Sequence, residues 1–266
     1  MSAGREARGA ILLDKDGVLV DFHRTWKPAI RRAALAVAEG DEALALTLLK
    51  VVGHDRRTDS FLPGSIWAAG TQEELFDAWH GLLPRMTREQ IAAIVSAVLE
   101  AAVPEPVVPL PVLRDLMGKA RAAGWKLAVV TNDLTGSAEK TARLHEIDHL
   151  LDAVIGSDLC ERPKPHPDLV FRAADTLSLP PGRMVMVGDN VHDGEMARRA
   201  GCATFIGVLS GTSGHAELAP LAAHVVADVA AALELVLSME KDERGPGATN
   251  GMSGPLARAG RRSVLE

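Results

Sequence analysis

The stretch AILLDKDG, residues 10–17, decides the interpretation of the fold. Four apolar residues end abruptly in acidic and turn-forming residues, which is typical of a buried parallel strand. Similar apolar runs follow at 127–130, 153–155, 184–187 and 203–206, with a weaker one at 224–227. Helical patterns alternate with these runs near 109–123, 136–147, 167–178 and 192–200. This alternation predicts an α/β fold, with a doubly wound, Rossmann-like parallel sheet as its core.

The segment 22–105 interrupts the alternation of strands and helices. It contains helical patterns near 26–39, 41–51, 71–81 and 87–101, and no convincing strand. We therefore predict a small all-helical cap domain at 22–105, inserted into a core formed by residues 1–21 and 106–240. Residues 241–266 are rich in glycine and charge without periodicity, and we predict a disordered tail there.

Composition narrows the classes of partner. The chain of 266 residues has 29 Lys and Arg against 35 Asp and Glu, a net charge of −6. This balance argues against nucleic acid as a partner, because binding the phosphate backbone requires a basic face.

The two cysteines, Cys160 and Cys202, fit a reducing compartment. No apolar run is long enough for a signal sequence or membrane span, so we expect a cytoplasmic protein without a membrane partner. The oligomeric state stays open.

Asp14 and Asp16 follow the first strand directly. Residues two apart in an extended chain point the same way, so both carboxylates are expected to face one pocket while Lys15 faces elsewhere. Ligands bind at this edge of open α/β sheets, and paired carboxylates suit a cation. Asp-x-Asp-Gly also occurs in calcium loops, but the Glu that an EF-hand requires is missing.

Polar residues follow three other predicted elements. Thr131 and Asn132 come after the strand at 127–130, Lys164 stands between two prolines, and Asp189 and Asp193 follow the strand at 184–187. Each has a structural alternative: helix capping for Thr131, Asn132 and Asp189, and a solvated surface position for Lys164. Their accumulation at successive strand ends favours a common site.

The ordered motifs DKDGV (14–18), VVTND (129–133), RPKP (162–165) and VGDNVHD (187–193) resemble those of the haloacid dehalogenase superfamily. The resemblance covers about residues 9–240. It includes the helical cap that this superfamily inserts after its first motif. Overall, the chain looks like the phosphoglycolate phosphatase branch.

The resemblance implies a phosphatase that hydrolyses small organic phosphate monoesters through an aspartyl-phosphate. Asp14 would attack phosphorus, and Asp16 would protonate the leaving oxygen and then take a proton from water. Lys15 would leave this chemistry untouched. Phosphoglycolate is the leading candidate substrate.

The resemblance also implies the cofactor and the phosphate ligands. Mg²⁺ would be held by Asp14, the backbone carbonyl of Asp16 and Asp189, while Asp193 would bind it through water or orient Lys164. Lys164, Thr131 and Asn132 would stabilise the phosphoryl oxygens.

The cap loop at 53–60 is the best specificity candidate, with His54, Arg56 and Arg57 as its residues. Either arginine could pair with a substrate carboxylate, and the alternative is a solvated charged turn. Trp26 and His23, just past the first motif, are further candidates for substrate contact, with packing as the alternative.

Other functions are open at this point. A phosphomutase of the β-phosphoglucomutase type shares every catalytic residue, and a non-catalytic phosphate-binding module would keep the site without turnover. Lys50 resembles the cap lysine of phosphonoacetaldehyde hydrolases, but those enzymes lack an acid at the position of Asp16. The sequence HEIDH at 145–149 matches a zinc-protease pattern, yet it falls where a predicted helix ends.

Overall fold

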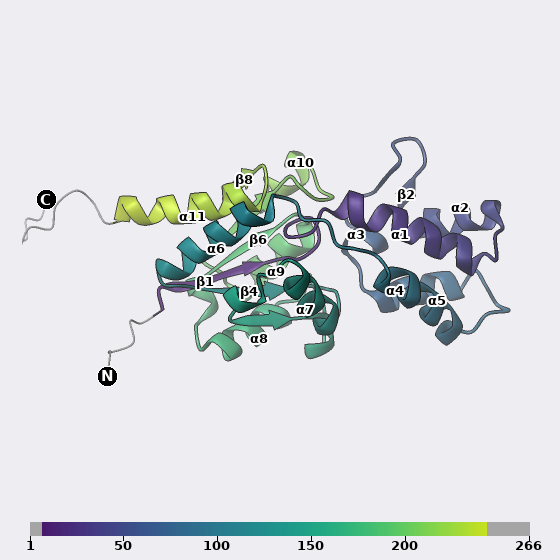
Figure 1. Ribbon diagram of the computed structural model, residues 1–266, viewed down its shortest axis with the longest axis horizontal. Helices are drawn as coiled ribbons and strands as arrows, with labels where there is room; N and C mark the ends of the chain where they lie inside the picture. Colours follow the sequence, from purple (N-terminus) through teal and green to yellow (C-terminus); the bar gives the residue numbers. More distant parts are fainter. Residues whose placement is uncertain (1–6, 244–266) are drawn as a thin grey trace, which may run out of the picture.

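A six-stranded parallel sheet in the order β5-β4-β1-β6-β7-β8 forms the centre of the molecule (Figure 1). It is seen in a computed structural model that describes residues 7–243. The strands are β1 (Gly9–Leu13), β4 (Trp125–Val130), β5 (Ala153–Ile155), β6 (Met184–Gly188), β7 (Thr204–Val208) and β8 (His224–Val226). Leu13 pairs with both Val129 and Val187, so β1, β4 and β6 end together at one edge. The predicted α/β parallel-sheet fold is confirmed.

Helices cover both faces of the sheet. One face carries α6 (Leu110–Ala122), α7 (Thr135–Leu144) and α11 (Val229–Glu243), and the other carries α8 (Asp168–Leu177), α9 (Val191–Ala200) and α10 (His215–Leu218). Short 3-10 turns connect them: η1 (Asp148–Leu150), η2 (Ser157–Leu159) and η3 (Pro181–Arg183). Strand β1 is buried on both sides, because Ile11 packs into one layer and Leu12 into the other.

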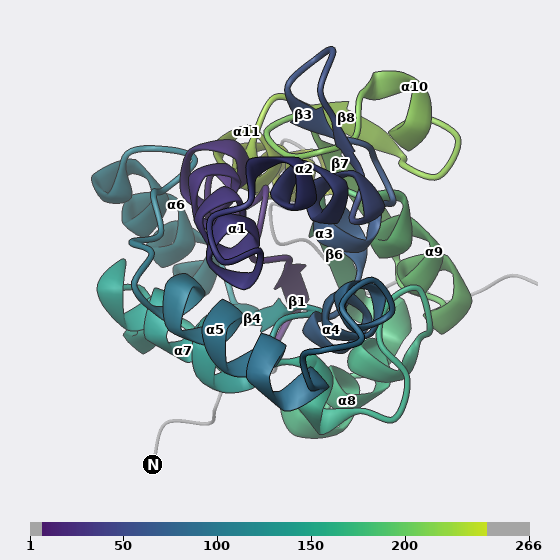
Figure 2. The ribbon, with the colours of Figure 1, turned by 90° about the vertical axis from the view of Figure 1, so that its right-hand side faces the viewer.

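A second group of helices lies over the edge where the strands end (Figures 1 and 2). These are α1 (Phe22–Val37), α2 (Glu42–Val51), α3 (Ile66–Ala69), α4 (Gln72–His80) and α5 (Arg88–Glu100). We call them, with their connections, the cap helices. They enclose their own hydrophobic core, in which Trp79 is fully buried and its Nε1 donates to the Leu48 carbonyl at 3.0 Å.

The cap helices include an antiparallel hairpin that the sequence analysis did not predict. Its strands, β2 (His54–Asp55) and β3 (Ser60–Phe61), are two residues each. The prediction of an all-helical cap is therefore wrong in this detail, because strands this short show no alternating pattern.

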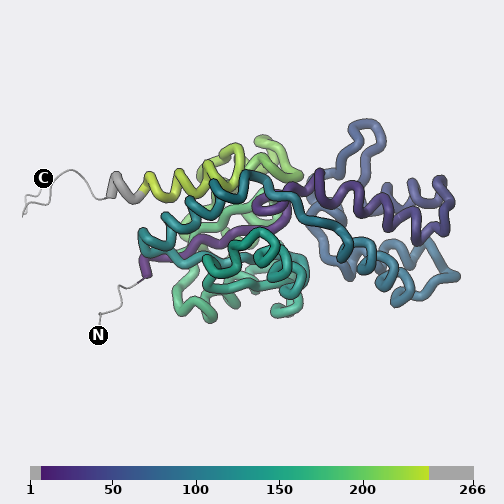
Figure 3. The backbone as a smooth tube through the Cα atoms, in the orientation of Figure 1, coloured from purple at the N-terminus to yellow at the C-terminus, as the bar shows by residue number. Residues whose placement is uncertain are grey.

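Two chain crossings join the cap helices to the sheet (Figure 3). They are bonded to each other, since the Asp21 amide donates to the Glu105 carbonyl at 2.7 Å and the Val107 amide donates to the Leu19 carbonyl at 3.3 Å. Asp21 also caps α1, accepting from the Arg24 amide at 2.9 Å. The crossings thus fix where the cap helices begin relative to the end of β1.

Helix α11 extends to Glu243, three residues into the predicted tail, because Lys and Glu are good helix formers. The remainder of that prediction, residues 244–266, lies outside the described residues. Within residues 7–243, no helix has the length and apolar character needed to cross a bilayer.

Candidate active site

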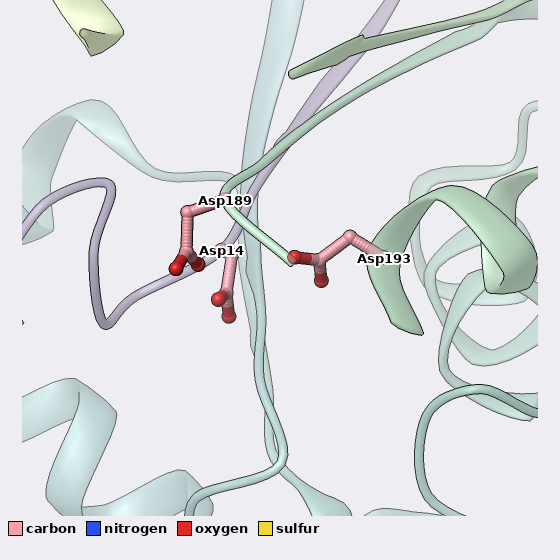
Figure 4. A group of neighbouring side chains, drawn as sticks. All are labelled: Asp14, Asp189 and Asp193. Carbon is pink, nitrogen blue, oxygen red and sulfur yellow. The ribbon is translucent and has the colours of Figure 1, made fainter. Parts of the chain in front are cut away.

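Three carboxylates meet where β1 and β6 end. Each of Asp14, Asp189 and Asp193 places an oxygen within 4.8 Å of the others (Figure 4). Asp14 is anchored through its backbone amide, which donates to the Val187 carbonyl at 2.9 Å. Lys164 Nζ donates to Asp14 Oδ1 at 2.7 Å and to Asp193 Oδ1 at 2.6 Å. Residues far apart in the sequence thereby form one buried cluster.

Asp189 is held by the loop that follows β7. The backbone amide of Thr212 donates to Asp189 Oδ2 at 2.7 Å, and its hydroxyl lies 3.1 Å from the same oxygen. Two glycines make room for this carboxylate: a Cβ at Gly17 would lie 2.5 Å from Asp189 Cγ, and one at Gly211 would lie 1.9 Å from Oδ2. Gly17 also has a φ of +81°, a conformation that favours glycine.

Asn132 and Thr131 lie beside the cluster, and both line the cavity described below. Asn132 Oδ1 accepts from the Lys164 amide at 2.8 Å, and its Nδ2 donates to the Ala69 carbonyl at 2.9 Å. The buried Thr131 Oγ1 accepts from the Asp133 amide at 3.1 Å. The side chain of Asn132 therefore ties the Lys164 loop to the cap helices.

The cluster carries more negative than positive charge in a buried place. Burial raises the pKa of Asp14 from 3.8 to about 6, although Lys164 opposes the rise. Burial and the charges of Asp14 and Asp193 raise the pKa of Asp189 well above its usual range. Burial would lower the pKa of Lys164, but Asp14 and Asp193 raise it, so this lysine is a cation. A set of carboxylate oxygens with excess negative charge is chemically suited to Mg²⁺.

Asp16 lies beside the cluster rather than in it. Its carboxylate accepts from Lys15 Nζ at 2.9 Å and 2.7 Å, and from Trp26 Nε1 at 2.5 Å. Burial raises the pKa of Asp16, against the effect of Lys15. As expected, Lys15 is not among the described residues that line the cavity, but its long side chain turns back to the Asp16 carboxylate, a contact that the sequence analysis did not predict.

A cavity of about 660 Å³ separates the cluster from the cap helices. From the sheet edge, its walls include Asp14, Asp16, Lys164 and Asp193. From the cap, its walls are mainly apolar and come from α1, α3, α4 and α5: Phe22, Trp26, Ile66, Trp67, Leu75 and Leu99. Sequence reasoning missed α3 and the start of α4 as walls of the site, since apolar residues in a helix indicate packing first.

The predicted specificity loop lies elsewhere. Of the described residues, His54, Arg56 and Arg57 are not among those that line the cavity. His54 is buried within the cap, where its Nε2 lies 3.2 Å from Asp59 Oδ1, while Arg56 and Arg57 are exposed. The reason is geometric, because the loop between β2 and β3 projects away from the sheet edge (Figure 1). Trp26 does line the cavity, whereas His23 does not.

The positions of the HEIDH sequence and of Lys50 in the fold decide between their alternative interpretations. In HEIDH, His145 caps the end of α7 and is buried with Nε2 3.1 Å from the Pro104 carbonyl, while His149 is exposed in η1. The two histidines do not share a helix, so the zinc-protease interpretation fails. Lys50 is exposed at the end of α2 and does not line the cavity that the described residues enclose.

The site is thus a buried cluster of carboxylates and a lysine. It lies at the strand ends of a doubly wound sheet, under inserted cap helices. The family model of the haloacid dehalogenase-like hydrolases matches residues 9–201. The chain therefore belongs to this family.

Individual proteins of known name are similar in sequence to parts of this chain. Phosphoglycolate phosphatase of Escherichia coli (strain K12) is 34% identical over 92 residues, 35% of this chain. The match spans only 36% of that relative's length. The counterpart from Salmonella typhimurium is 34% identical over 98 residues, 39% of its length.

Solved structures share the fold. A predicted phosphoglycolate phosphatase from Haemophilus somnus has a TM-score of 0.65 at 20% identity, covering 86% of this chain and 97% of its own. CbbY from Rhodobacter sphaeroides, solved in complex with phosphate, has a TM-score of 0.56 at 22% identity, covering 84% and 95%.

Proposed function

We propose that this protein is a Mg²⁺-dependent phosphatase of small organic phosphate monoesters. The observation that supports it most directly is the placement of Lys164 Nζ 2.7 Å from Asp14, with Asp189 and Asp193 beside them at the cavity of about 660 Å³. A buried cation next to a buried carboxylate nucleophile suits an incoming phosphoryl group, whose charge lies on its oxygens.

Asp14 acts as the nucleophile and Asp16 as the acid and base. An Asp14 oxygen attacks phosphorus, the bond from phosphorus to the ester oxygen breaks, and that oxygen takes the proton of Asp16. Asp16 then removes a proton from water as the water oxygen attacks phosphorus. This second step releases inorganic phosphate and restores the Asp14 carboxylate.

The remaining cluster residues bind and orient. Lys164 neutralises charge on the phosphoryl oxygens, which Thr131 and Asn132 also stabilise as polar neighbours. Asp193 holds Lys164 in place through their 2.6 Å contact. Asp14, Asp189 and the Asp16 carbonyl would hold Mg²⁺, which when bound supplies positive charge to the phosphoryl oxygens. Their oxygen donors fit that ion.

The substrate is a small molecule, and 2-phosphoglycolate is the first candidate because of the partial identity to phosphoglycolate phosphatases. The charges of the cap residues that line the cavity widen the range of candidate substrates. Among the described cap residues that line it, none is Lys or Arg, and Glu100 is the charged one. Phosphate esters of uncharged alcohols therefore belong beside 2-phosphoglycolate in any test.

We propose that residues 22–105 act as a cap unit over the core of residues 1–21 and 106–240. Two crossings connect them, and contacts such as Asn132 to Ala69 hold them together. A lid of this kind limits the access of water to the aspartyl-phosphate until the alcohol product leaves the cavity.

The test is phosphate release from a panel of esters with Mg²⁺ and with chelator. We expect release that requires Mg²⁺ and that falls by at least about 1000-fold in Asp14→Asn, because a nucleophile is lost. Asp175→Asn is the matched control, since this exposed aspartate lies on α8 away from the cavity. Turnover that survives Asp14→Asn would refute the assignment. An isomerised sugar phosphate without free phosphate would indicate a mutase, and binding without turnover would indicate a phosphate-binding module.

A further inference from the structure

Lys15 is buried between two carboxylates that lie on different strand ends. Its side chain is 1% exposed, and its Nζ lies 2.7 Å from Asp16 Oδ2 and 3.0 Å from Asp133 Oδ2. The ammonium also lies 4.8 Å from the centre of a Trp26 ring. Burying a charge costs free energy that an apolar side chain would not, so a packing role alone does not account for a lysine here.

The contacts of Lys15 continue into the cap helices. Asp133 accepts from Ser137 Oγ at 2.6 Å through Oδ2, and from Gln72 Nε2 at 3.0 Å through Oδ1. Gln72 is the first residue of α4. A continuous series of polar contacts therefore runs from the cap, through Asp133 and Lys15, to the carboxylate of Asp16.

On this geometry, we propose that Lys15 is a positioning residue that orients the Asp16 carboxylate, and that the contact of Gln72 with Asp133 completes this arrangement when the cap lies against the core. The proposal rests on the proposed function in one respect, namely that Asp16 is the acid.

Orientation matters at Asp16 because its side chain is 26% exposed and borders the cavity. Among residues 7–243, Trp26 Nε1 is the one side-chain donor to this carboxylate that would remain if Lys15 were replaced. A proton donor must lie within hydrogen-bond reach of the leaving oxygen, and a misplacement of about 1 Å can cost roughly 100-fold in rate.

The test compares two esters in Lys15→Met, which keeps most of the length of the side chain and removes its charge. An alkyl phosphate has a poor leaving group that needs the acid, whereas p-nitrophenyl phosphate has a good leaving group that does not. We expect kcat/KM for the alkyl ester to fall roughly 10- to 100-fold, with a change below about threefold for the aryl ester. Asp16→Asn, which removes the acid itself, is expected to show the largest fall in kcat/KM for the alkyl ester relative to the aryl ester.

Equal losses for both esters would mean that Lys15 only supports the scaffold, and no loss would mean that it does nothing; either result overturns the proposal. If Lys15→Met does not fold, Gln72→Ala and Gln72→Glu decide, because the second places a carboxylate against Asp133. We expect the alkyl-selective loss in both variants and a larger one in Gln72→Glu. An unchanged ratio of the two esters in these variants would overturn the proposal.

The proposed function is tested separately, by wild-type turnover and its loss in Asp14→Asn. If the wild-type protein releases phosphate from neither ester, the proposed function fails and this proposal fails with it. If Asp14→Asn abolishes turnover but the ratio is unchanged in Lys15→Met, the proposal alone fails.

Discussion

Asp189 shows how single atoms determine the site. Its carboxylate is placed by Thr212, and it fits because Gly211 has no side chain: a Cβ there would lie 1.9 Å from Asp189 Oδ2. We predict that Gly211→Ala displaces Asp189, weakens Mg²⁺ binding and lowers turnover roughly 10- to 100-fold. Turnover measured against Mg²⁺ concentration checks this.

Gly182→Ala in η3 is the control for that variant, since a Cβ there meets no atom closer than 3.9 Å. It is expected to match the wild type. If Gly211→Ala showed the wild-type Mg²⁺ dependence, Asp189 would not be a ligand.

Helix α6 offers a prediction about one element. Gly118 lies inside this helix, and a Cβ built on it meets no atom within 4 Å. Glycine in a helix interior costs stability because it loses more conformational freedom on folding than alanine. We expect Gly118→Ala to raise the free energy of unfolding by about 0.5–1 kcal/mol, with turnover unchanged. Urea denaturation measures the first and phosphate release the second; a destabilised variant would show that α6 packs differently here.

Stability against pH is a property of the whole molecule, because folding buries the aspartate cluster. In the folded state, burial raises the pKa of Asp14 from 3.8 to about 6, so the folded protein binds this proton more tightly than the unfolded chain. Without metal, this contribution to stability is fully present below about pH 4 and is lost as pH rises through about 6. The midpoint of thermal unfolding in chelator should therefore fall across this range.

Mg²⁺ should reverse this trend, because metal binding requires deprotonated carboxylates and stabilises the state that binds. We expect the gain in unfolding temperature from Mg²⁺ to be small near pH 4 and to grow as pH rises past about 6. Asp14→Asn is expected to flatten both dependences. A gain that is independent of pH in the wild type would contradict the role of Asp14 in the site.

The sequence alone determined the sheet and the core of the site. Buried parallel strands leave short continuous apolar runs, and amphipathic helices leave a period of about 3.6 residues. Asp14, Thr131 and Asp189 follow strands directly. Parallel strands end at one edge, so these residues had to meet there. The meeting of Lys164 with Asp14 depends instead on a loop that folds back over 150 positions.

Tertiary structure alone decided what surrounds the site. The contact of Gln72 with Asp133 joins residues 61 positions apart, and no local pattern encodes it. The same holds for Lys15, whose direction depends on the carboxylates that pack against it, and for Arg56 and Arg57, which the β2–β3 hairpin carries away from the cavity. Local patterns specify which elements form and where they end, whereas the direction of a long side chain is decided by the elements that pack around it.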